Sequence, residues 1–252
     1  MHLIPFDLMQ IEPGRWGATV TRVGAILALT VVFAALGHLV RGVSRSGAIA
    51  GGLVCFALLV SVGPSAFAGL LVVFAVTWAA TRWGRSRKQI LGTAERREGR
   101  TATQVLANTG MAAACALCYS AMDEPLMLIG MAAALAEAAA DTVSSEFGQA
   151  YSRHAYLVTT FERVPAGTDG GITVAGSLAG AVAAVLVSAA CMLAGLFPAR
   201  WMWIATAAGV LGMLVDSFLG ALFERRKWVG NDTVNLTSTV FAAVVAAVAA
   251  SW

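Results

Sequence analysis

Charged residues are scarce in this sequence, and their scarcity excludes a soluble domain. Asp, Glu, Lys and Arg make up only 12% of the 252 residues, whereas hydrophobic residues make up 58% and the mean hydropathy is +0.76. Soluble domains carry about twice this charged fraction. Apolar runs of roughly 16 to 24 residues follow one another with short breaks, which is the spacing of helices that cross a ~30 Å hydrocarbon core. The composition therefore predicts an integral membrane protein.

Histidine and cysteine are also rare, and this argues against metal sites or nucleophilic catalysis that depend on them. The three histidines are not spaced as ligands of one metal ion. The sequence CALC does contain a Cys-x-x-Cys pair, but it has no second pair and no neighbouring histidine. All four cysteines fall in apolar runs, where free cysteine behaves as a small hydrophobic residue: Cys55, Cys115, Cys118 and Cys191.

The N-terminal stretch MHLIPFDLMQIEPGRW lacks two features of a signal peptide. It has no basic segment ahead of an apolar core and no small-residue cleavage site, and it carries Asp7 and Glu12. Phe6 and Trp16 suit the headgroup level of a bilayer. We therefore expect residues 1–16 to form a short interfacial segment.

The apolar runs predict an all-α, polytopic fold that forms a single transmembrane domain over residues 1–252. Lipid favours this reading because every backbone polar group must be satisfied within its own segment. We expect about eight helices, or seven if the short second run is re-entrant. The expected spans are 17–40, 47–62, 65–82, 104–120, 126–147, 172–196, 201–224 and 234–251.

The basic residues predict the orientation of these spans. Across eight alternating spans, 14 of the 17 Lys and Arg residues fall on one side of the membrane. Lys and Arg near helix ends collect on the cytoplasmic side. We therefore expect a multi-pass protein of the cell (inner) membrane with both termini outside. The loops 83–103 and 148–170 would lie in the cytoplasm.

Two groups of acidic residues lie within the apolar spans. The fifth span, with AEAAADTVSSEFG, places Glu137 and Asp141 on one face and Glu146 near its end. The seventh places Asp216 and Glu224 on one face. An ionisable group inside a bilayer costs at least ~2.5 to 3.5 kcal/mol and is a functional candidate. Pairing with arginines of the cytoplasmic loops is the alternative explanation.

A glycine-rich turn opens the sixth span with VPAGTDGGITVAGSLAG. Unpaired backbone N–H groups and the positive end of a helix would suit an anion there. The run is not a Walker sequence because no Lys follows, and its later glycines are explained equally well by close helix packing. The candidates for phosphate binding in this turn are Thr168, Asp169, Gly170 and Gly171.

Further polar residues accumulate at cytoplasmic span ends. Arginines of the loop 83–103 could neutralise phosphate, although topology and anionic lipids also explain them. Amides at the start of the fourth span need hydrogen-bond partners if they are buried. Those at the start of the eighth could be helix N-caps. These candidates are Arg96, Arg97, Arg100, Gln104, Asn108, Asn231 and Asn235.

Six motifs together resemble one known family. SRSGAIAG, QVLANTG, ADTVSSEFG, GTDGGITVAGSLAG, LVDSFLGA and NDTVNL occur in the order found in the membrane-bound phytyl-phosphate kinase family of tocopherol biosynthesis and its bacterial and archaeal relatives. The resemblance implies an enzyme that phosphorylates an isoprenyl monophosphate to the diphosphate, using CTP or another nucleoside triphosphate with Mg²⁺. The site residues that it implies are Asn108, Asp141, Glu146, Asp216 and Ser217.

The sequence departs from the family pattern at two positions. Asp169 stands where Asn is expected in the glycine motif, and Glu224 stands where Gln is expected. An additional acid beside a triphosphate could change the preference for metal or nucleotide. The resemblance therefore leaves the phosphate donor open.

The acidic residues fit the chemistry of such a kinase. Carboxylates bind Mg²⁺ together with phosphate oxygens and water, so Asp141 and Asp216 are the expected metal ligands, with Glu146 as a third ligand or a neighbour. Two alternatives are a CTP-dependent lipid cytidylyltransferase and a cation- or proton-coupled transporter, although a transporter would hold its substrate nearer the midplane. The expected partners are a nucleoside triphosphate, an isoprenyl monophosphate and membrane lipid. A nucleic acid is not expected.

Overall fold

The computed structural model describes the chain from Pro13 to Trp252, and its side chains from Thr21 onward. The placements predicted for Phe6 and Trp16 lie outside the described side chains. Helix α1 already begins at Pro13.

Seven of the described helices are long and apolar enough to cross a membrane, and α2 is a shorter apolar helix of 17 residues. This confirms the predicted all-α polytopic fold. Because α2 is short, the structure is compatible with both predicted numbers of membrane-spanning helices, eight or seven. The eight helices are α1 (Pro13–Leu39), α2 (Arg45–Ser61), α3 (Pro64–Arg82), α5 (Ala102–Met122), α6 (Leu126–Tyr151), α7 (Val174–Leu193), α8 (Ala199–Leu219) and α9 (Asn231–Ala250).

Short elements occupy the two segments that we expected to be loops. The short helix α4 (Arg85–Leu91) lies between α3 and α5. After α6, a three-stranded antiparallel sheet forms in the order β2-β1-β3. Its strands are β1 (His154–Leu157), β2 (Arg163–Pro165) and β3 (Gly171–Ile172).

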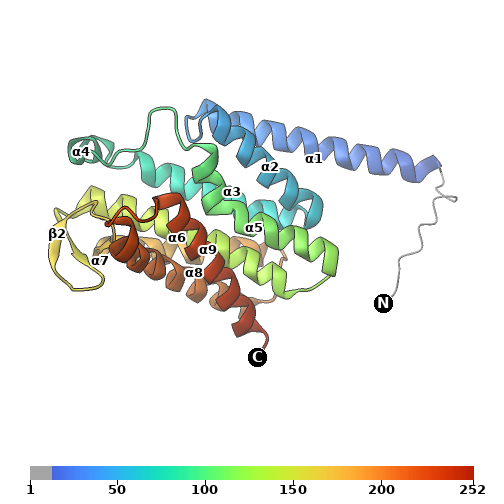
Figure 1. Ribbon diagram of the computed structural model, residues 1–252. Helices are drawn as coiled ribbons and strands as arrows, with labels where there is room; N and C mark the ends of the chain where they lie inside the picture. Colours follow the sequence, from blue (N-terminus) through green and yellow to red (C-terminus); the bar gives the residue numbers. More distant parts are fainter. Residues whose placement is uncertain (1–12) are drawn as a thin grey trace.

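Helix α6 lies at the centre of the bundle (Figure 1). Every residue from 129 to 140 is buried, and α6 contacts α3, α5, α7, α8 and α9. Much of this stretch is alanine, which lets neighbouring helices approach closely. The central position of α6 explains how carboxylates on its length can face several other helices.

Glycines on α7 and α8 permit the closest approaches to α6. A Cβ atom at Gly176 would lie 2.5 Å from the carbonyl oxygen of Ser144, and one at Gly212 would lie 2.5 Å from Cγ of Glu137. Side chains cannot fit in either space. These contacts show that Gly176 and Gly212 serve helix packing.

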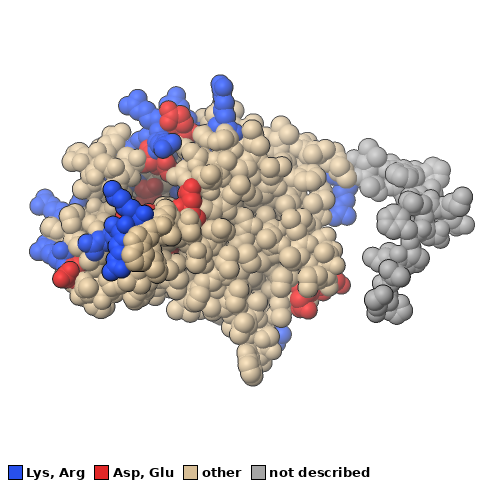
Figure 2. All heavy atoms as spheres, in the orientation of Figure 1, with Lys and Arg blue, Asp and Glu red and all other residues tan. Residues whose placement is uncertain are grey.

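Most of the charged side chains gather at one end of the bundle. We call this the polar end, and it carries α4, the small sheet and the start of α9. Figure 2 shows Lys and Arg around a hollow that contains acidic side chains at this end. The two sides of the membrane are not distinguished by the fold itself, so the cytoplasmic placement of the polar end stays a prediction.

Candidate active site

A polar cavity of ≈ 280 Å³ lies at the polar end, between the small sheet and helices α5 to α9. It gathers side chains from segments more than 120 residues apart in the sequence. Glu224, from the π-helical turn η1 (Gly220–Glu224) that continues α8, also lines it. The predicted residues that line the cavity are Arg100, Gln104, Asn108, Asp141, Glu146, Thr168, Asp169, Gly170, Gly171, Asp216, Ser217, Asn231 and Asn235.

Two carboxylates from different helices meet in this cavity. Asp141 of α6 lies close enough to Asp216 of α8 for their carboxyl groups to interact. The positive charge of Arg100 interacts electrostatically with Asp141. Ser238 Oγ donates a hydrogen bond to Asp216 Oδ2 at 3.1 Å. The pair is therefore held on rigid helices, with a cation on one side and a hydroxyl donor on the other.

A pair of amides fixes the second carboxylate. In the amide orientation that satisfies its neighbours, Asn235 donates to Asp216 Oδ2 at 3.1 Å and accepts from Asn108 Nδ2 at 3.0 Å. Asn108 Nδ2 also donates to the backbone oxygen of Gln104 at 2.8 Å. This chain of contacts joins α5, α9 and α8. It explains why amides are needed at both predicted positions.

The N-cap explanation for the start of α9 is wrong. The N-cap residue is Gly230, and no side chain caps the helix. Asn231 is instead the first residue of α9 and lines the cavity. Gln104, by contrast, has a capping role: its side chain accepts from the Thr101 backbone N–H at 2.7 Å, which completes a capping box on α5.

Arg100 is positioned through its backbone by the first motif, SRSGAIAG, and by Gly42 just before it. The Ser44 N–H donates to the Arg100 carbonyl oxygen at 2.9 Å, and the Arg100 N–H donates to the Gly42 oxygen at 3.1 Å. A Cβ atom at Gly47 would collide with the same Arg100 carbonyl. The Arg100 guanidinium then reaches α6, where Nη2 donates to Thr142 Oγ1 at 3.3 Å.

The other two predicted arginines lie elsewhere. Arg97 is exposed and does not line the polar cavity. Arg96 lines a second, mainly apolar cavity of ≈ 90 Å³ enclosed by α1, α2, α3, α5 and α6, which we call the apolar groove. The polar cavity and the apolar groove share Glu95, Arg100 and Asn108.

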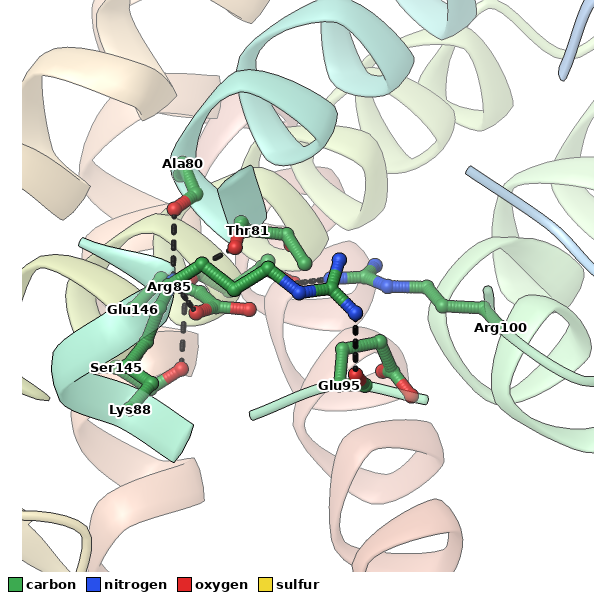
Figure 3. A network of polar contacts seen from close by, with 9 residues as sticks. Ala80, Thr81, Arg85, Lys88, Glu95, Arg100, Ser145 and Glu146 are labelled. Atoms are coloured by element: carbon green, nitrogen blue, oxygen red, sulfur yellow. Dashed lines mark hydrogen bonds and ion pairs between the residues drawn. The ribbon is translucent and has the colours of Figure 1, made fainter. Parts of the chain in front are cut away.

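A buried lysine that the sequence did not single out pairs with Glu146. Lys88 of α4 is fully buried, donates to the backbone oxygens of Ala80 at 3.0 Å and Thr81 at 2.8 Å, and forms an ion pair with Glu146 (Figure 3). In the sequence Lys88 is one of seven basic residues between Arg82 and Arg100, and no local signal separates it from them.

The glycine turn forms a wall of the cavity. Gly170 has a φ of +74°, and a Cβ atom there would lie 2.5 Å from the backbone nitrogen of Ala221 in η1. Inside the turn, Thr168 N–H donates to the Pro165 oxygen and Gly171 N–H donates to the Thr168 oxygen. Contrary to our expectation, these two N–H groups are not available to an anion. The start of α7 is capped by Thr173, whose Oγ1 accepts from Gly176 N–H at 3.0 Å.

The donor set fits Mg²⁺ completed by substrate oxygens. Among the described residues, no group of three His, Cys, Asp or Glu side chains could hold a metal ion by itself. Mg²⁺ is typically bound by one or two carboxylates with phosphates and water, and Asp141 and Asp216 offer such a pair. Since Glu146 is held by Lys88, its predicted role as a third ligand is left without direct support. The metal assignment stays a prediction.

Glu137 lies one helical turn below Asp141 and does not line the polar cavity. It is buried, and its Oε1 atom has no hydrogen-bond partner within the described part of the chain. Glu137 nevertheless lies close enough to interact electrostatically with Asp141 and Asp216 and with Ser238, so it is a buried neighbour of the site rather than part of the cavity wall.

Comparison with known proteins gives the family. The chain is 32% identical over 218 residues to "Protein VTE6, chloroplastic" of Arabidopsis thaliana, which covers 82% of this chain and 65% of that protein. It is 32% identical over 182 residues to an uncharacterized membrane protein of Synechocystis, with 70% of each covered. An uncharacterized membrane protein of Methanocaldococcus jannaschii is 40% identical over 124 residues, with 47% of this chain and 49% of that protein covered.

No solved structure matches the chain. The chain spans about two thirds of the length of VTE6, and the plant, cyanobacterial and archaeal matches confirm the family resemblance predicted from the six motifs. The model of the family described as Integral membrane protein DUF92 matches residues 28–243. Because this match covers most of the sequence, the chain belongs to the Integral membrane protein DUF92 family.

Proposed function

We propose that the chain is a membrane kinase that transfers the γ-phosphoryl group of a nucleoside triphosphate to an isoprenyl monophosphate. CTP is the first candidate for the donor. The observation that carries the proposal is the polar cavity, where Asp141, Asp216 and Arg100 meet beside the apolar groove. The resemblance of the six motifs to phytyl-phosphate kinases supplies the substrate class.

The reaction needs positioning and charge neutralisation more than acid–base catalysis. An oxygen of the prenyl monophosphate attacks the γ-phosphorus, a new P–O bond forms, and the bond between the γ-phosphorus and the bridging oxygen breaks, releasing the nucleoside diphosphate. A phosphate monoester has a second pKa of about 6 and is largely dianionic at neutral pH, so it needs no general base. The main barrier is the approach of two anions.

The cavity residues suit this task. Asp141 and Asp216 would hold Mg²⁺, which would supply neutralisation of the phosphate charge. Arg100 would neutralise the acceptor phosphate at the boundary of the two cavities. Asn235 keeps Asp216 oriented through its hydrogen bond, and Thr168, Asp169 and Gly170 would border the nucleotide.

The proposed orientation places this site in the cytoplasm of a cell whose inner membrane holds the protein. It is supported by the Lys and Arg residues that gather at the polar end (Figure 2), because cytoplasmic ends carry the excess of these residues. Both termini would then lie outside. A cytoplasmic site would also have direct access to nucleoside triphosphates.

The function is tested with purified protein in lipid nanodiscs. CTP, ATP, GTP and UTP are each supplied with Mg²⁺ and a panel of prenyl monophosphates, and prenyl diphosphate and nucleoside diphosphate are quantified. We expect both products in equal amounts with at least one donor, and no activity after chelation of the metal. A cytidylyltransferase would release pyrophosphate instead. The absence of a prenyl diphosphate across the whole panel would refute the proposal.

The carboxylate pair is tested by Asp141→Asn and Asp216→Asn. We expect each variant to lose about 10²-fold or more in kcat, which is the scale of removing one group that stabilises transition-state charge. Glu162→Gln is a matched control because Glu162 is an exposed acid at the same end of the molecule. If both Asp variants kept wild-type rates, the assignment of the site would be wrong.

A further inference from the structure

The apolar groove has a charged mouth and an apolar interior. Phe33, Val54, Leu70 and Phe74 line its inner part, on helices α1, α2 and α3. Its mouth lies at the polar end, where these helices end or begin. The arginines that line the mouth are Arg41, Arg82, Arg85, Arg96 and Arg100.

A glycine and aromatic rings shape the groove. Gly51 leaves space along α2, because a Cβ atom there would meet only Val105 Cγ1 at 3.9 Å, while Phe33 and Phe74 meet edge to face with their ring centroids 5.6 Å apart. The Trp78 ring closes part of the mouth, because its Nε1 donates to the Val40 oxygen at 3.2 Å. The apolar groove is therefore bounded by aromatic rings on one side and by α2 on the other.

The depth of the groove matches one leaflet of a membrane. Leu70 and Arg82 both line it and lie twelve residues apart on α3, which corresponds to roughly 18 Å along a helix. Half of a ~30 Å hydrocarbon core is about 15 Å. A hydrocarbon chain in the groove would therefore run from the headgroup level to about the middle of the bilayer.

The mouth is suited to an anion. Among the described residues, none of the five arginines forms an ion pair with a carboxylate. Arg82 lies over the Trp78 ring at 4.6 Å from its centroid, and Arg85 Nη2 donates to the backbone oxygen of Glu95 at 3.4 Å. Figure 3 shows Arg85 and Arg100 pointing toward one another above Glu95. An anionic headgroup would thus find several arginines that are not engaged in ion pairs.

The groove opens into the polar cavity through shared residues. Glu95, Arg100 and Asn108 line both spaces. An anionic group held by Arg100 would therefore lie at the boundary, with its hydrocarbon chain on one side and Asp141 and Asp216 on the other. This continuity favours a lipid whose phosphate takes part in the reaction.

We propose that the apolar groove binds the isoprenoid chain of a prenyl monophosphate, and that the surface of α2 facing the groove limits the length of this chain. The inference rests on the proposed function for the fate of the phosphate. Ala48 and Gly51 lie on the groove-lining face of α2, about 4.5 Å and 9 Å below Arg45 along the helix.

Two substitutions test the groove at different depths. A Cβ atom at Gly51 would meet only Val105 Cγ1, at 3.9 Å, so Gly51→Leu can fill the groove without moving the backbone. Ala48→Leu obstructs it one turn nearer the mouth. Gly110→Leu is the matched control, because Gly110 is a helical glycine on α5 with no atom within 4 Å of a new Cβ and does not line the groove.

Chain-length preference is the decisive measurement. For wild type and each variant, kcat/KM is measured with geranylgeranyl and geranyl monophosphate. We expect Gly51→Leu to lower the ratio of the longer to the shorter substrate by about tenfold or more, since steric exclusion from an apolar pocket acts on this scale. Ala48→Leu should lower kcat/KM for both substrates, and Gly110→Leu should leave the ratio unchanged. An unchanged ratio in an active Gly51→Leu variant would overturn the inference.

A binding measurement separates the groove from the kinase. The thermal stability of the protein in detergent is measured without nucleotide, with and without each prenyl monophosphate. We expect geranylgeranyl monophosphate to stabilise wild type, but not Gly51→Leu. If this pattern held in a protein without kinase activity, the inference would stand and the proposed function would fall. Equal stabilisation of wild type and Gly51→Leu, or a stronger effect of phosphatidic acid than of any prenyl phosphate, would overturn it.

Discussion

At the scale of single residues, the first motif acts through its backbone and its lack of side chains. Ser44 of the motif and Gly42, two residues before it, hydrogen-bond to the Arg100 backbone, and Gly47 makes room for the Arg100 carbonyl. The motif SRSGAIAG contains no acid and only one cation, so its own chemistry did not reveal its purpose. Its role is to place the Arg100 side chain between the polar cavity and the apolar groove.

The Lys88–Glu146 pair should stabilise the docking of α4 on the bundle. The side chains are 1% and 12% exposed, and Lys88→Met would leave Glu146 without its cation. Removing one partner of a buried ion pair typically costs about 3 to 5 kcal/mol. We expect a loss near the lower end of this range in the free energy of unfolding, measured by denaturation in detergent.

The matched control for this pair is the double variant Lys88→Met, Glu146→Gln. It removes both charges, so we expect it to be more stable than Lys88→Met alone. A double variant that lost the sum of the two single effects would contradict a direct coupling between these side chains.

Glu137 should be dispensable for the fold. One of its oxygens has no partner within the described residues although the side chain is buried, and an unsatisfied buried polar atom costs about 1 to 3 kcal/mol. We expect Glu137→Met, which is similar in length and apolar, to keep or raise the thermal stability and to retain kinase activity. An activity loss as large as that of Asp141→Asn would place Glu137 in the active site after all.

At the scale of elements, the contact between the glycine turn and η1 holds one wall of the cavity. Gly170 lies against the backbone of Ala221, and Glu224 follows in the same π-helical turn. Turns of this kind are rare and occur often at functional sites. The turn lets α8 present Asp216 and Glu224 to one cavity while its end packs against the glycine turn.

Gly170→Ala should damage this wall. The substitution places a Cβ atom 2.5 Å from the Ala221 nitrogen at a φ of +74°, so it adds a collision to the ordinary cost of a left-handed residue, which is about 1 to 2 kcal/mol. We expect lower thermal stability and a fall in kcat of about tenfold or more, since a displacement of 1 Å can cost 10²-fold.

Gly195→Ala provides the comparison for this substitution. Gly195 has a similar φ of +81°, but a Cβ atom there would meet nothing within 4 Å. We therefore expect Gly195→Ala to show only the conformational cost and to retain full kinase activity. Equal damage by the two substitutions would refute the role of the Gly170 contact.

The small sheet could not be predicted from the sequence. Its strands are four, three and two residues long, too short for an alternating pattern to be recognised. It exists because the chain between α6 and α7 folds back on itself, with Tyr156 paired to both Arg163 and Ile172. The long helices, in contrast, could be predicted because apolar length alone identifies them.

At the scale of the whole molecule, the orientation in the membrane can be tested directly. In a cysteine-free background, a single cysteine is introduced as Glu162→Cys at the polar end or as Arg200→Cys at the start of α8, and both positions are exposed. We expect a membrane-impermeant maleimide to label Arg200→Cys in intact cells, and Glu162→Cys only in inverted vesicles. The reverse pattern would contradict the cytoplasmic placement of the site.

The membrane environment, the long helices and most members of the candidate site could be predicted from the sequence alone. Apolar runs and rare intramembrane polar residues carry this information locally, because burying a polar group in lipid is costly and each exception needs a reason. Asp141, Asp216 and Asn108 were found in this way.

Which of many similar residues meet in space depends on the tertiary structure. Of three predicted arginines it selected Arg100, because the backbone of Gly42 and Ser44, just before α2, holds that residue, and of seven basic loop residues it buried Lys88. The structure also shows that the apolar groove and the polar cavity share a boundary. Charge and hydropathy along the sequence indicate how far a residue lies from water. Which residues of distant segments lie side by side depends instead on how the helices pack against one another.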